Sequence, residues 1–123
     1  MFTEKLLRRL RDRGFDISPR RDLFLLSKDG KQRWLNIREK EKPSYYRFGK
    51  RFEYGTPKVH FDRYKKMVAR GEPVYSVICE RSTGKVYIAP FAALIKTARE
   101  YSGNRLDTGG TVFLPKDAYR ELR

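Results

Sequence analysis

The chain has 123 residues, and its 29 lysines and arginines against 15 aspartates and glutamates give a formal net charge of +14. Such a surplus is typical of proteins that bind nucleic acid, because basic side chains gain affinity by displacing the counterions condensed on phosphates. No apolar stretch approaches the roughly 18 residues of a membrane-spanning helix, and the arginine-rich N-terminus lacks the apolar region of a secretory signal. We therefore expect a cytoplasmic protein without membrane association, folded as one domain over residues 1–123.

The hydrophobic spacing predicts a mixture of helices and strands in a defined order. The predicted elements are, in chain order, a helix from Thr3 to Gly14, a strand at 15–17, strands at 22–27 and 32–39, an irregular segment at 42–54, a helix from Pro57 to Arg70, strands at 73–79 and 85–89, a helix at 91–99, a strand at 112–114 and a helix at 117–122. In the helix from Pro57 to Arg70, the expected inward positions are Val59, Phe61, Tyr64 and Val68. The single cysteine, Cys79, stands in an apolar strand and is expected to be a buried core thiol.

The most informative segment is the strand at 32–39, which follows a turn at Lys28-Asp29-Gly30. Leu35 and Ile37 alternate there with Asn36 and Arg38, so the strand has one apolar and one polar face. Asp22 opens the apolar run of the preceding strand. The hairpin therefore places an acid opposite Asn36 and Arg38.

These three positions resemble the active site of the PD-(D/E)XK nuclease superfamily, whose members carry Asp, then Asp or Glu, then Lys. Here Asp22 is kept, Asn36 replaces the second acid and Arg38 replaces the lysine. The predicted element order over residues 3 to 95 is also similar to the αβββαβ core of this superfamily. The resemblance implies an α/β protein with a restriction-endonuclease-like fold, in which helices flank a mixed central sheet.

The two replacements change the chemistry that the resemblance implies. Members of the superfamily use two carboxylates to hold Mg²⁺, but Asn36 carries no negative charge and Arg38 stays protonated and cannot act as a base. We therefore expect a degenerate site without a metal cofactor, in which Arg38 binds a phosphate or pairs with Asp22. The alternative is an atypical endonuclease in which Asp22, Glu4 on the first helix and the Asn36 amide hold Mg²⁺ or Mn²⁺. An ordinary helix acid is the other interpretation of Glu4.

The irregular segment at 42–54 is the leading candidate for a nucleic-acid surface, because it interleaves cations with aromatic rings that can stack on bases. Its candidate contact residues are Lys42, Tyr45, Tyr46, Arg47, Lys50 and Arg51, and the only histidine, His60, is added to them as a residue that could touch the substrate.

We interpret the chain as a nucleic-acid-binding protein, with DNA as the first expected ligand. The alternatives are a metal-dependent endonuclease and a basic adaptor or inhibitor that binds an acidic protein. A homodimer is a further expectation from the resemblance. No motif distinguishes DNA from RNA, because that preference depends on groove shape and 2′-hydroxyl contacts.

Overall fold

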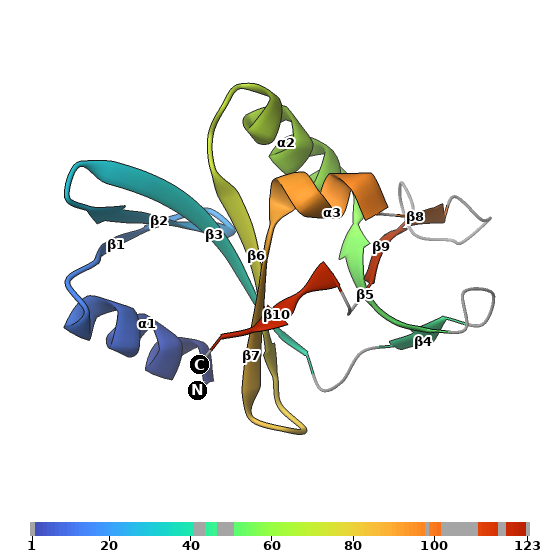
Figure 1. Ribbon diagram of the computed structural model, residues 1–123, viewed down its shortest axis with the longest axis horizontal. Helices are drawn as coiled ribbons and strands as arrows, with labels where there is room; N and C mark the ends of the chain where they lie inside the picture. The colour runs from blue at the N-terminus through green and yellow to red at the C-terminus, as the bar shows by residue number, and fades with distance from the viewer. Residues whose placement is uncertain are drawn as a thin grey trace.

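The computed structural model of the chain describes residues 2–40, 44–46, 51–97, 99–101, 111–115 and 118–122 (Figure 1). The helices are α1 (Phe2–Asp12), α2 (Lys58–Ala69) and α3 (Phe91–Thr97), and the strands are β1 (Asp16–Arg20), β2 (Leu23–Lys28), β3 (Lys31–Lys40), β4 (Ser44–Tyr46), β5 (Arg51–Pro57), β6 (Val74–Glu80), β7 (Lys85–Pro90), β8 (Arg99–Tyr101), β9 (Thr111–Pro115) and β10 (Arg120–Glu121).

A six-stranded mixed sheet with the strand order β1-β2-β3-β6-β7-β10 forms the centre of the fold. Its neighbours pair antiparallel except β3 and β6, which run parallel because α2 lies in the connection between them. The helices α1 and α2 and the strands β1, β2, β3 and β6 of this sheet follow the expected αβββαβ order, but β4 and β5, which belong to a second sheet, stand between β3 and α2. The α/β class and the mixed central sheet flanked by helices are thus confirmed.

The sheet separates two apolar clusters because successive side chains of a strand point to opposite faces. On β6, Val77 and Cys79 pack with Leu6 of α1, whereas Val74 and Ile78 pack with α2 and α3. Cys79 is fully buried, as its apolar strand setting predicted. Within the described ranges, every helix is too short or too polar to cross a membrane.

The hairpin between β2 and β3 forms as its sequence predicts. Lys28 pairs with Lys31, and the two turn residues Asp29 and Gly30 both have a positive φ, of 53° and 77°. A two-residue hairpin with this conformation matches the twist of the strands, and Asp and Gly tolerate it at little cost. Beyond this hairpin, β3 is longer than β2. The last pair of the ladder joins Phe24 to Leu35, whereas β3 continues along β6 as far as Lys40.

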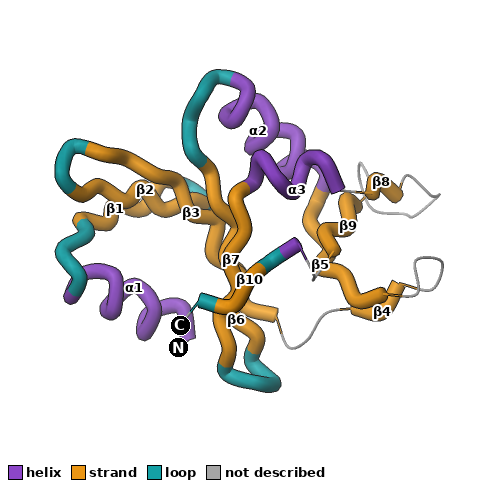
Figure 2. The backbone as a smooth tube through the Cα atoms, viewed as in Figure 1, coloured by secondary structure: helices purple, strands orange, loops and turns teal. Residues whose placement is uncertain are grey.

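Three predictions about secondary structure and packing are wrong. The segment at 42–54 was expected to be irregular, but its described parts form β4 and β5, which join β9 and β8 in a second sheet, in the order β4-β5-β9-β8. This sheet lies beside α2 and α3 (Figure 2). Its central pairing joins residues more than 50 positions apart, so no local pattern announces it.

The helix expected at 117–122 is also not formed over residues 118–122, the described part of that range. The strand β10 forms there instead, because it pairs with β7 while the hydroxyl of the buried Tyr119 hydrogen-bonds Ser76 on β6. On α2, Val59 was expected to face inward but is 71% exposed. The buried positions of this helix are Phe61, Tyr64 and Met67, so its apolar face begins two residues later than predicted.

Candidate functional site

The turn between β1 and β2 presents the acid that the sequence singled out. Arg20 pairs with Leu23, so Arg21 and Asp22 are the two residues of a tight turn. Arg21 has a φ of 58°, a left-handed conformation that glycine adopts freely and that costs other residues about 1 kcal/mol. The protein would therefore be more stable with glycine at this position than with arginine. Backbone strain of this kind is concentrated at functional sites.

Three side chains of α2 converge on the carboxylate of Asp22. His60, Arg63 and Tyr64 lie at spacings of three and four residues, so they share one face of the helix. Arg63 forms an ion pair with Oδ1, the hydroxyl of Tyr64 donates to Oδ2, and Nδ1 of His60 lies 2.8 Å from Oδ2. Both carboxylate oxygens therefore have donors from one helix face.

These contacts shift the pKa values of the cluster. Burial raises the pKa of Asp22, but the hydrogen bonds from Tyr64 and His60 and the positive charge of Arg63 outweigh it, so the net pKa lies below its ordinary value. Burial, together with the neighbouring Asp22 carboxylate, raises the pKa of Tyr64. Asp22 is thus ionised and Tyr64 is a neutral donor at neutral pH.

The buried Asn36 on β3 completes the cluster. Its Nδ2 atom donates to the backbone oxygen of Asp22 at 3.1 Å and to the Tyr64 hydroxyl at 3.0 Å. The amide therefore ties the turn to α2 through hydrogen bonds. Asp22 and Asn36 lie together as the hairpin predicted, but the guanidinium that pairs with Asp22 belongs to Arg63 of α2, where the sequence had suggested Arg38.

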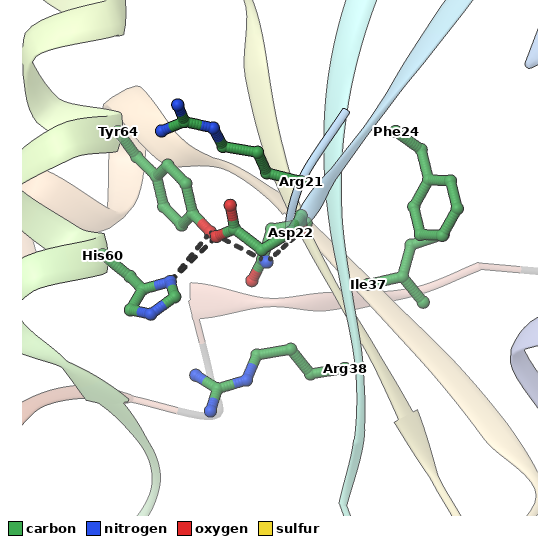
Figure 3. Close-up of a pocket in the computed structure, with 8 residues that line it drawn as sticks. Arg21, Asp22, Phe24, Ile37, Arg38, His60 and Tyr64 are labelled. Carbon is green, nitrogen blue, oxygen red and sulfur yellow. Dashed lines mark hydrogen bonds and ion pairs between the residues drawn. The ribbon is translucent and has the colours of Figure 1, made fainter. Parts of the chain in front are cut away.

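A pocket of about 280 Å³ opens at this cluster, where β3 extends past the start of β2. It is lined by Arg21, Asp22, Phe24, Asn36, Ile37, Arg38, His60 and Tyr64. Figure 3 shows Arg21 and Arg38 extending toward α2 on opposite sides of Asp22, while Phe24 and Ile37 point the other way. The polar side of the pocket is thus bordered by cations from a turn and a strand and by the histidine of a helix.

The positive charges along β3 lie close enough to affect one another. Lys40 is half-buried and follows Arg38 on the same face of the strand. Burial lowers the pKa of Lys40, and the positive charge of Arg38 lowers it further. A bound anion would relieve this repulsion, so the face of β3 that carries Asn36 is suited to phosphate.

The residues present do not fit the divalent metal of a nuclease site. Among the described residues, Asp22 is the one carboxylate that lines the pocket, and its oxygens already accept from Arg63, His60 and Tyr64. No three His, Cys, Asp or Glu side chains gather as a metal-binding group in the described portion of the chain. Hard cations such as Mg²⁺ need several oxygen ligands and compensating negative charge, and the cations around Asp22 oppose both.

The structure places the remaining candidate residues at different distances from the pocket, and some of them lie outside the described residues. His60 lies in the pocket, but Glu4 is exposed on α1, which packs against the opposite face of the sheet. Lys42, Arg47 and Lys50 lie outside the described residues, and for Tyr45, Tyr46 and Arg51 only the backbone, in β4 and β5, is described.

Sequence reasoning did not find Arg21, Lys40 or Arg63, and it assigned Tyr64 only to the core. The spacing of His60, Arg63 and Tyr64 was the available signal, since it places three hydrogen-bond donors on one helix face. The conformation of Arg21 and the environment of Lys40 depend on tertiary structure and carry no comparable pattern.

A structural comparison identifies the fold. The structure of D212, a nuclease from a fusselovirus, superimposes with a TM-score of 0.60 and 14% sequence identity over 98% of this chain and 80% of D212. The fold is nuclease-like. No protein-family model and no curated protein sequence matches the chain. At 14% identity the similarity establishes a restriction-endonuclease-like fold and leaves the activity to be argued from the site.

Proposed function

We propose that this chain binds nucleic acid at the Asp22 pocket, DNA included, and does not hydrolyse it with a divalent metal ion. One observation carries the proposal: the Asp22 carboxylate is ion-paired with Arg63 and hydrogen-bonded to His60 and Tyr64 instead of being held open for a metal. With that acid internally paired, the neighbouring Arg21 and Arg38 give the pocket a positive potential.

Further support comes from the charge and the fold. A net charge of +14 favours association with a polyanion, and Arg38 and Lys40 form a row of cations leading from the pocket. D212 is a nuclease, so the fold that this chain shares with it is compatible with binding a phosphodiester backbone. The expected contacts at Lys42, Tyr45, Tyr46, Arg47, Lys50 and Arg51 follow Lys40 in the sequence and belong to the same proposal.

The test measures binding and metal-dependent cleavage of the same labelled DNA. Fluorescence anisotropy should show affinity that falls steeply with salt, and Arg38→Gln should reduce the slope of log K against log salt by about 0.9, one phosphate contact. The matched control is Arg8→Gln, because Arg8 is exposed on α1 at the opposite face of the sheet. An equal loss in both variants would place the binding surface elsewhere.

Denaturing gels in Mg²⁺ and in Mn²⁺ should show intact DNA in every lane. Metal-dependent products that disappear in Asp22→Ala would overturn the proposal and identify an atypical endonuclease. Absence of DNA binding at about 0.1 M salt would instead favour an acidic protein as partner. The cytoplasmic location and the homodimer are parts of the same proposal, and sedimentation of the free chain and of its DNA complex tests the homodimer.

A further inference from the structure

The pocket contains a histidine that is oriented by a carboxylate, which binding alone does not require. Nδ1 of His60 lies 2.8 Å from Oδ2 of the ionised Asp22, so this nitrogen carries the proton and donates it to the carboxylate. The lone pair of the neutral ring is then on Nε2. Figure 3 shows this second nitrogen turned away from Asp22. His60 is 39% exposed, so a ligand in the pocket can reach the ring.

Positively charged side chains line the same pocket as His60. Arg38 reaches from β3 toward α2, on the side of Asp22 where the ring of His60 lies (Figure 3). Lys40 follows on the same face of β3, and Arg21 borders the pocket from the turn. Cations that are already in place before the reaction stabilise the negative charge that develops on a phosphoryl group in the transition state.

The choice of substrate follows from the nucleophile that such a site can use. Hydrolysis of DNA needs an activated water, and the residues around Asp22 do not fit the metal ion that usually activates it. RNA carries its own nucleophile, the 2′-hydroxyl next to the phosphorus. A correctly placed base and nearby cations can therefore act on the 2′-hydroxyl of RNA, which DNA lacks.

We propose that this pocket cleaves RNA without a metal ion by transesterification, with His60 as the general base. The inference rests on the proposed nucleic-acid binding and adds an activity to it. Nε2 of His60 takes the proton of the 2′-hydroxyl, the 2′-oxygen forms a bond to phosphorus, and the bond from phosphorus to the 5′-oxygen breaks. The departing 5′-oxygen takes a proton from solvent water, and the imidazolium returns its proton to solvent. The products are a 2′,3′-cyclic phosphate and a 5′-hydroxyl end, and no water is consumed.

The four polar residues have distinct roles in this reaction. His60 and Arg38 are catalytic residues, because they contact the reacting hydroxyl and the phosphoryl oxygens. Asp22 and Tyr64 are positioning residues. Asp22 fixes the tautomer and the orientation of His60, and Tyr64, held by the Asn36 amide at 3.0 Å, donates to the same carboxylate oxygen.

The experiment incubates the purified full chain with end-labelled single-stranded RNA in EDTA. Three oligonucleotides of one sequence are compared: RNA, 2′-O-methyl RNA and DNA. We expect cleavage of the RNA alone, with 2′,3′-cyclic phosphate ends. His60→Gln should lower the rate by about a hundredfold or more, with RNA binding in anisotropy unchanged within a few fold. Asp22→Asn should lower kcat and leave KM nearly unchanged, as expected when a residue acts through His60.

The matched control is Lys66→Gln, an exposed position of α2 that does not line the pocket, and it should cleave as the wild type does. RNA that is bound but stays intact in EDTA would overturn the inference and leave the proposed binding in place. Cleavage that survives in His60→Gln would overturn it as well, since it would come from another site or a contaminant. A wild-type chain that binds neither RNA nor DNA would overturn both proposals. If His60→Gln fails to fold by circular dichroism, Arg38→Gln decides, with the same expected loss of rate.

Discussion

Replacing Asp22 by alanine should lower the free energy of unfolding by about 2 to 4 kcal/mol. The Tyr64 side chain is 1% exposed, and a hydrogen bond from such a group to a charged acceptor contributes about 1.5 to 3 kcal/mol. His60 and Arg63 are 39% and 40% exposed, so solvent screens their interactions with Asp22 to about 0.2 to 1 kcal/mol each. The buried hydroxyl therefore dominates the loss.

Urea denaturation at pH 7 measures this loss, with the fluorescence of the single tryptophan, Trp34, as the signal because it packs against the core next to α2. Tyr64→Phe keeps the ring and removes the hydroxyl, so it should cost about 1 to 3 kcal/mol. The double variant should show a coupling energy of about 1 kcal/mol or more. An Asp22→Ala protein as stable as the wild type would refute the reasoning. Replacing an acid that serves only to bind a ligand leaves the stability of the fold unchanged or raises it.

The pH dependence of the same difference provides a second measurement. The pKa of Asp22 is lowered by folding, so its contribution is complete above the unfolded value of 3.8 and is lost as the pH falls through the folded pKa. The difference in stability between the wild type and Asp22→Ala should therefore shrink as the pH falls below about 3.8. A difference that stays undiminished well below pH 3.8 would contradict the ion-paired cluster.

Three further predictions concern other parts of the molecule. Arg21→Gly should raise the stability by about 1 kcal/mol in urea denaturation, because it relieves a positive φ, while it weakens DNA binding; a loss of stability would show that the turn is unstrained. Cys79 should react with iodoacetamide only in denaturant, since burial raises its pKa to about 11, and rapid alkylation of the native chain would argue against this packing. Thr3→Val should speed hydrogen exchange in α1 at pH 7, because the Thr3 hydroxyl and backbone N–H donate to Glu39. These bonds lower the pKa of Glu39, so the difference should fade as the pH drops below about 4.5, and persistence at lower pH would exclude this contact as the cause.

Local signals were sufficient to predict the central part of the fold. The alternation of Leu35 and Ile37 with Asn36, and the Asp29-Gly30 turn, depend on residues that are neighbours in sequence, and both are present in the structure. The order of helices and strands around them then predicts the mixed sheet, because a helix between β3 and β6 allows these strands to run parallel.

The partners of Asp22 could not be predicted in the same way. Tyr64 is 42 residues away from Asp22 in the chain, and Arg63 is 41 away. The cation that pairs with Asp22 depends on where the connection through α2 returns to the sheet. From the sequence alone, Arg38 on the neighbouring strand was an equally plausible partner. The pairing of β5 with β9 is hidden for the same reason, since it too joins distant segments.

The length by which β3 exceeds β2 also bears on how the protein avoids aggregation. From Ile37 to Lys40 the strand is paired with β6 on one side, and no other described strand covers its second side. Unpaired peptide groups of this kind can recruit a strand from another molecule and start intermolecular β-pairing. Arg38 and Lys40 place two positive charges there, so a second copy that approached in register would meet like charges at both positions. The cations that we assign to phosphate binding thus also protect the open edge of the sheet from self-association.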